Sequence, residues 1–147
     1  DYPANLFVAG FIGSPQMNFF NVTLEKEGND VVAKFGDNKI TIPTSKLSKF
    51  TDESYIGKEV IMGIRPEHIH DEEMYTSTMT DGLIKAKVEV TELMGAETYL
   101  YLNCEGNNFT ARVDPSTLAK SGDEITVALD TNKIHIFDKE TEKTITN

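Results

Sequence analysis

Runs in which every second residue is apolar fill most of this chain and constrain its fold more than any other feature. Phe20, Val22 and Leu24 alternate with polar residues, and the later runs repeat this period of a half-buried β-strand. Turn residues such as GDN at 36–38, Gly95 and EGNN at 105–108 separate the runs. About ten short strands with turns at this spacing predict an all-β protein built as small β-barrels of the oligonucleotide/oligosaccharide-binding (OB) type.

The clearest run lies at 84–90. Here Ile84, Ala86, Val88 and Val90 alternate with charged or polar residues, so we expect these four side chains to share the buried face of one strand. Cys104 ends a later apolar run and is expected to be a small buried residue.

Only the beginning of the chain shows helical character. Pro3 suits the first turn of a helix, and Gly13, Ser14 and Pro15 end it. Residues 1–18 are therefore interpreted as a helix and hinge, and 19–147 as the barrel domain. The segment 66–82 lacks periodicity and is read as a connection, which divides that domain into lobes at about 19–66 and 82–147.

Composition excludes several classes of function. The 147 residues carry a formal net charge of −10, which repels nucleic-acid phosphates and disfavours nucleic acid as a partner. A single cysteine suits a reducing cytosol. Neither a signal peptide nor an apolar run of about 20 residues, as a membrane span requires, is found. The start at Asp1 suggests a fragment.

No catalytic pattern is present. The chain lacks a G-x-x-x-x-G-K-[ST] loop for nucleotide phosphates and a G-x-S-x-G nucleophile turn. We therefore expect no catalytic residues and no enzymatic activity in this segment.

Two clusters of residues allow both a functional and a structural interpretation. In GIRPE, Arg65 and Glu67 flank Pro66; Arg65 suits an anionic ligand, but we favour a structural role in pinning the loop after a strand. Two histidines followed by carboxylates suggest a metal site, which we disfavour because no further His or Cys lies nearby. Its members are His68, His70, Asp71, Glu72 and Glu73.

Two other groups of side chains leave alternatives open. The hydroxyls of Ser77, Thr78 and Thr80 would suit an oxyanion. The aromatic residues Tyr99, Tyr101 and Phe109 suit stacking on a sugar or a base, but an interface with another protein is favoured on such an acidic chain.

Four segments in order together resemble the transport-associated OB (TOBE) domain, found at the C-terminus of ATP-binding subunits in maltose-type ABC importers. These are PANLFVAGFIGSPQMNFF at 3–20, MGIRPEHI at 62–69, GLIKAKVEVTELMGAETYLYL at 82–102 and KIHIFDKETEKTI at 133–145. The resemblance implies an OB or MOP-like (molybdate-binding type) barrel that serves dimerisation and regulation.

The same resemblance implies the surroundings of the domain. The parent subunit would use ATP and Mg²⁺ to drive carbohydrate uptake, whereas this segment would hold no cofactor and no metal. The partners would be a second copy, the nucleotide-binding domain of the same chain, a membrane permease reached indirectly and a cytosolic regulator. The domain would lie in the cytoplasm at the inner face of the membrane. The residues expected at structural or interdomain positions are Gly13, Ser14, Pro15, Met17, Asn18, Arg65, Pro66 and Glu67.

The alternative is a stand-alone sugar- or oxyanion-binding barrel similar to molybdate-binding proteins. Those proteins carry a Ser-Ala-Arg-Asn run before the strand at 82–102, whereas this chain reads TSTMTDGL at 76–83. The missing arginine and asparagine argue against an oxyanion ligand.

Overall fold

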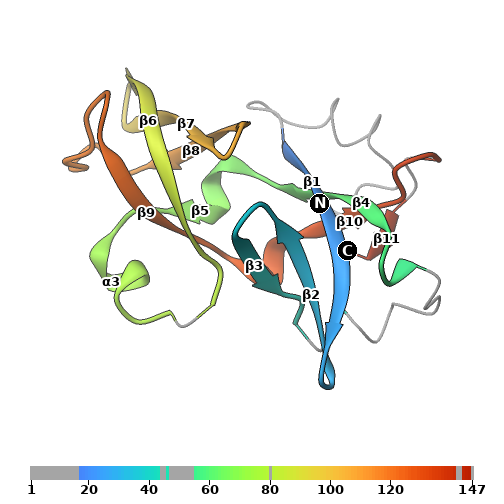
Figure 1. Cartoon of the computed structure of the whole chain (residues 1–147). Helices are drawn as coiled ribbons and strands as arrows, with labels where there is room; N and C mark the ends of the chain where they lie inside the picture. The colour runs from blue at the N-terminus through green and yellow to red at the C-terminus, as the bar shows by residue number, and fades with distance from the viewer. Residues whose placement is uncertain (1–16, 44–45, 47–54, 80, 142–143, 147) are drawn as a thin grey trace. The chain divides into compact units, whose positions relative to one another are not determined.

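The computed structural model describes residues 17–43, 46, 55–79, 81–141 and 144–146, the last three as backbone only. Residues 1–16 of the predicted helix and hinge at 1–18 lie outside these residues. The described part contains eleven strands (Figure 1), which confirms the all-β class. The chain divides into two compact units, one formed by 1–64 with 131–147 and the other by 65–130.

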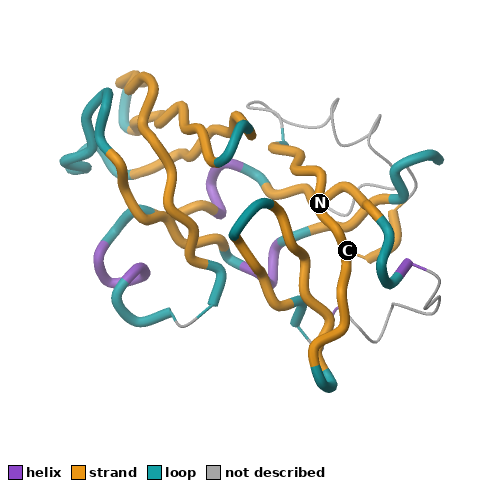
Figure 2. The backbone as a smooth tube through the Cα atoms, viewed as in Figure 1, coloured by secondary structure: helices purple, strands orange, loops and turns teal. Residues whose placement is uncertain are grey.

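Six antiparallel strands form the sheet of the first unit. Its order is β11–β10–β4–β1–β2–β3, and the chain path is seen in Figure 2. The strands are β1 Asn18–Glu27, β2 Asp30–Phe35, β3 Asn38–Thr41, β4 Glu59–Ile64, β10 His135–Phe137 and β11 Thr144–Thr146.

Alternation places one face of β1 in the core of the first unit. Phe20, Val22 and Leu24 are buried, and the Phe20 ring lies 5.3 Å from that of Phe35 on β2. In β2 the pattern is less regular than the sequence predicts, because Val32 is buried together with Val31 and Ala33.

The last strands return to the first unit. Ile136 on β10 pairs with Met62 on β4, and β11 then pairs with β10. The predicted lobes at 19–66 and 82–147 therefore differ from the observed units, which assign 131–147 to the first. Pairing between strands so far apart in sequence leaves no local signal.

Five strands form the sheet of the second unit, in the order β5–β9–β6–β7–β8. Contacts of β8 with β5 and with the 3₁₀ turn η2 bring the ends of the sheet together. The elements are η2 Pro66–His68, β5 Ile69–His70, helix α3 Glu73–Thr76, β6 Leu83–Met94, β7 Glu97–Cys104, β8 Asn107–Val113 and β9 Glu124–Leu129. The 3₁₀ turn η3 Thr131–Lys133 leads back to the first unit.

The prediction that 66–82 is a plain connection is wrong. The segment holds η2, β5 and α3, and Ile69 of β5 is fully buried and pairs with Leu129 of β9. A two-residue strand has no periodicity of its own, so only its pairing partner reveals it.

Val90 does not share the buried face predicted for it. Ile84, Ala86 and Val88 are buried, but Val90 is 51% exposed. The β6–β7 register shifts between Val88 and Val90, as a β-bulge does when it inserts one residue and turns the following side chains to the other face.

Two-residue turns join the neighbouring strands where the sequence predicts them. Glu105 has φ +49°, the only positive φ of a non-glycine residue in the described part, and Gly106 follows at +86°. Two consecutive positive φ values define the type I′ hairpin turn, whose twist matches that of the strands.

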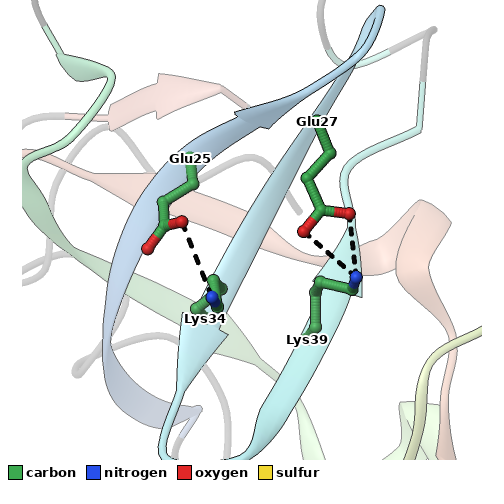
Figure 3. Close-up of polar contacts among 4 residues, drawn as sticks. All are labelled: Glu25, Glu27, Lys34 and Lys39. Atoms are coloured by element: carbon green, nitrogen blue, oxygen red, sulfur yellow. Dashed lines mark hydrogen bonds and ion pairs between the residues drawn. The ribbon is translucent and has the colours of Figure 1, made fainter.

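Ion pairs on the first unit lie at the surface. In Figure 3, Lys34 Nζ lies 3.6 Å from Glu25 Oε1, and Lys39 Nζ lies 2.8 Å and 3.0 Å from the two carboxylate oxygens of Glu27. Exposed pairs of this kind contribute at most about 1 kcal/mol each. The buried apolar face, and not these pairs, stabilises the sheet.

Asp138 follows β10 and accepts three hydrogen bonds. The donors are the amides of Thr141 (2.8 Å) and Glu140 (2.9 Å) and the Tyr55 hydroxyl (2.7 Å). The Thr141 amide, and after it the Tyr55 hydroxyl, lowers the pKa of the Asp138 carboxyl below its usual value, because these donors favour the charged form.

We expect Asp138→Asn to weaken the pH dependence of stability on the acid side. A carboxyl with a lowered folded-state pKa contributes stability above its unfolded pKa of about 3.9, and this contribution is lost as the pH falls through the folded value. Urea midpoints between pH 6 and pH 2.5 measure the effect. Equal acid slopes for the wild type and Asp138→Asn would contradict it; Asp30→Asn, at the exposed start of β2 in the same unit, is the control.

Candidate interaction surfaces

The GIRPE segment begins the second unit. Arg65 caps η2 without a side-chain hydrogen bond to it, the His68 amide donates to the Arg65 carbonyl at 3.0 Å, and Pro66 is buried. The Asp130 amide donates to the His68 carbonyl at 3.0 Å. Two chain segments that lead into and out of the second unit are thus hydrogen-bonded together. Glu67 is half-buried in the same turn.

The residues predicted before the first strand are only partly described. Gly13, Ser14 and Pro15 lie outside the described residues. Met17 is 4% exposed and Asn18, the first residue of β1, is 8% exposed. Met17 packs with Phe137, so it belongs to the core of the first unit. Its predicted interdomain role, like that of the other seven residues, stays a prediction.

Three of the five histidines and carboxylates at 68–73 have side-chain contacts with other groups. His70 stacks on Tyr75 with the ring centroids 4.1 Å apart, and its Nδ1 lies 3.8 Å from Glu72 Oε1. Asp71 accepts a hydrogen bond from the Thr117 hydroxyl. Within the described ranges, no three His, Cys, Asp or Glu side chains converge as metal ligands do.

The hydroxyls considered for an oxyanion donate within their own segment. Ser77 Oγ donates to the Glu73 carbonyl and Thr78 Oγ1 to the Met74 carbonyl, both at 2.5 Å. Thr80 lies outside the described residues. These bonds back to the helix leave both described hydroxyls committed to the backbone.

A cavity of 560 Å³ lies on the second unit. Five carboxylates and no lysine or arginine are among its lining residues, and the carboxylates are Asp71, Glu72, Glu73, Asp114 and Asp123. The backbone and hydroxyl donors around Asp114 lower the pKa of its carboxyl, the Ser116 side chain first. The negative potential of such a lining repels anions.

The outer face of β6–β7–β8 carries exposed apolar and aromatic groups. Tyr99 and Tyr101 are half-buried, and the Tyr101 hydroxyl donates to Glu92 at 2.8 Å. This bond, which holds the Tyr101 proton, raises the pKa of the phenol. Arg112 pairs with Glu97 at 2.9 Å. Phe109 is buried, so the predicted three-ring platform is reduced to the two tyrosines.

Sequence reasoning missed the exposed apolar residues at the hairpin end of β6, of which Val90 and Met94 lie on this face and Leu93 on the other. Beyond the bulge, Val90, Leu93 and Met94 are 51%, 70% and 49% exposed. Leu93 and Met94 next to the Gly95 turn were visible in the sequence as apolar residues at a hairpin end, but the bulge that exposes Val90 was not.

Two family models match the chain. The MalK OB fold domain matches residues 13–69 and the TOBE domain matches residues 62–137. Together they span residues 13–137, which hold every described strand except β11.

Similar proteins include ATP-binding subunits of sugar importers. The oligosaccharides import ATP-binding protein MsmX of Bacillus subtilis is 47% identical over 97% of this chain and 38% of its own length. The multiple sugar-binding transport ATP-binding protein MsmK of Streptococcus mutans is 42% identical over 97% of this chain and 37% of its own length. The trehalose/maltose import ATP-binding protein MalK of Thermococcus litoralis is 38% identical over 99% of this chain and 38% of its own length. The chain thus spans 37–38% of the length of these relatives.

A solved structure supports the fold. The cytoplasmic molybdate-binding protein ModG superposes with a TM-score of 0.58 over 86% of this chain and 97% of its own, at 13% identity. Similarity at this identity shows the MOP-like fold and nothing about the ligand. No helix of the described residues is long and apolar enough to cross a membrane.

Proposed function

Since this chain belongs to the TOBE domain family, we propose that it is the C-terminal regulatory and dimerisation domain of the ATP-hydrolysing subunit of a sugar ABC importer. The observation that carries this proposal is the 47% identity with an oligosaccharide import ATP-binding protein, over 97% of this chain and 38% of the relative. The remaining length of such a relative is enough for a nucleotide-binding domain.

In this proposal the parent subunit, and not this segment, binds ATP and Mg²⁺. Its nucleotide-binding domain and a transporter permease are the proposed partners, with a second copy of the segment and a cytosolic regulator. The parent would lie in the cytoplasm at the inner face of the membrane. A contact between two regulatory domains would keep the ATPase domains at an effective concentration of roughly mM and so favour their closure.

The oxyanion alternative is less supported. The described cavity of the second unit is lined by five carboxylates, and the hydroxyls of Ser77 and Thr78 donate to backbone carbonyls. An anion would meet repulsion and few donors there. A sugar-binding barrel has no specific observation in its favour.

Sedimentation equilibrium of the chain at concentrations from micromolar to millimolar tests the dimerisation role. We expect a concentration-dependent dimer, because a regulatory contact between subunits needs a self-complementary patch. A strictly monomeric chain at the highest concentration would contradict dimerisation. In parallel, thermal shifts against sugars and molybdate should be absent, since a tight ligand raises stability in proportion to ln(1 + [L]/Kd).

A further inference from the structure

Strand β6 is longer than its neighbour β9. The β6–β9 register runs from Leu83 to Lys87, and the last hydrogen bonds join Val88 to Asp123 (2.8 Å) and to Gly122 (2.7 Å). The β6–β7 register continues to Met94. Within the described part of the chain, residues 89–94 of β6 therefore pair with another strand on one side only.

The hairpin geometry shows which backbone groups face the open side. Met94 and Glu97 flank a two-residue turn, with Gly95 at φ +64°, and such flanking residues exchange both hydrogen bonds. Hydrogen-bonded pairs alternate along an antiparallel ladder. Glu92 therefore bonds to Tyr99, whereas the N–H and C=O of Thr91 and Leu93 point away from β7.

The side chains along this edge are apolar and acidic. Val90, Leu93 and Met94 are among the exposed large hydrophobic residues, and Glu89 and Glu92 are also exposed. No lysine or arginine occurs within 89–94. On the same outer face Arg112 is paired with Glu97, so it does not neutralise Glu92.

We propose that the edge of β6 at 89–94 docks an extended segment of another protein, in which apolar residues and lysine or arginine follow one another at every second position, on the face of Glu92. The added strand would bond to the backbone of Thr91 and Leu93, as in strand addition to a free sheet edge. A basic side chain opposite Glu92 matches its charge, and apolar neighbours cover Val90 and Met94 on that face.

The charge of Glu92 makes a basic partner more favourable at this edge than a second copy of the chain. A two-fold antiparallel pairing that uses both free residues would place Thr91 opposite the second copy's Leu93. The same register sets Glu92 directly opposite Glu92 of the second copy. Like charges in directly opposed positions destabilise a strand pair, so the edge favours a basic partner.

Two fluorescent nine-residue peptides test the proposal on the complete chain. In the first peptide, valine and lysine take turns at the odd positions and threonine fills the even ones. The second peptide has glutamate in place of every lysine. Fluorescence anisotropy should show saturable binding of the basic peptide, weakened by salt, and at least tenfold weaker binding of the acidic one. Bound basic peptide should slow hydrogen exchange at the amides of Thr91 and Leu93.

Three variants locate the contact. Glu92→Lys should weaken binding of the basic peptide at least tenfold. Leu93→Pro removes an outward N–H from the edge and should abolish binding of this peptide. Glu140→Lys, with the same charge change on the first unit, should leave the affinity unchanged. If Leu93→Pro does not fold, Glu92→Lys and the exchange data still decide.

Equal affinity for both peptides, an unaffected Glu92→Lys variant or unchanged exchange at Thr91 and Leu93 would overturn the proposal. So would self-association of the chain that Leu93→Pro abolishes, because it would assign the edge to a second copy. These outcomes are independent of the regulatory role, which sedimentation of the unmodified chain tests.

Discussion

Deletion of residues 131–147 is expected to unfold the first unit and to leave the second folded. The deleted segment supplies β10, the partner of β4, and the buried side chains of Ile134, Ile136 and Phe137. At about 1.5–3 kcal/mol for each fully buried side chain, their loss is comparable to the entire stability of a small domain, about 5–15 kcal/mol. All strands of the second unit lie within 65–130.

Amide NMR spectra measure this directly. Signals from 65–130 should keep their dispersion, whereas signals from the described residues before 65 should collapse to unfolded positions. A fragment of 65–130 alone, which is a size at which many domains fold, should show the same dispersed signals. Retention of native shifts in β1 and β4 after the deletion would contradict the expectation.

Substitution of Gly63 is expected to destabilise the first unit through a steric clash. Gly63 lies on β4 between Phe19 of β1 and His135 of β10. A Cβ atom there would lie 2.5 Å from Met17 Sδ and 3.0 Å from Phe137 Cε2. Overpacking of this kind costs about 1–3 kcal/mol; Gly63→Ala should fall in this range and Gly63→Val should exceed it.

Urea unfolding of three variants separates the clash from other effects. Gly28→Ala is the control, because its Cβ would meet no atom within 4 Å and only its φ of +61° is unfavourable. Met17→Ala removes the nearest atom and should recover part of the Gly63→Ala loss in the double variant, a coupling that Gly28→Ala should not show. Gly63→Ala with wild-type stability would overturn the argument.

The sequence alone was sufficient to predict the strands and turns that depend on neighbouring residues. The alternation at 20–24 and 84–88 and the turns at 36–38, 95 and 105–108 were predicted from neighbouring residues, and the structure confirms them. The family was also predicted correctly, because segments along nearly the whole chain resemble it.

The candidate sites were less accessible to prediction. Arg65, Pro66 and Glu67 could be picked out as a motif, but their place in the turn that begins the second unit follows from η2 and its bond to Asp130. The exposed tip at Val90 depends on a bulge that appears only when β6 and β7 are paired.

Short-range side-chain alternation and turn chemistry thus specify that this chain forms strands, and about where each begins, since both act between residues close in sequence. Pairing across the chain sets the rest: β10 completes the first sheet, β5 completes the second, and β6 extends past β9 to leave an open edge. These features depend on hydrogen bonds and burial between residues distant in sequence, which no local pattern records.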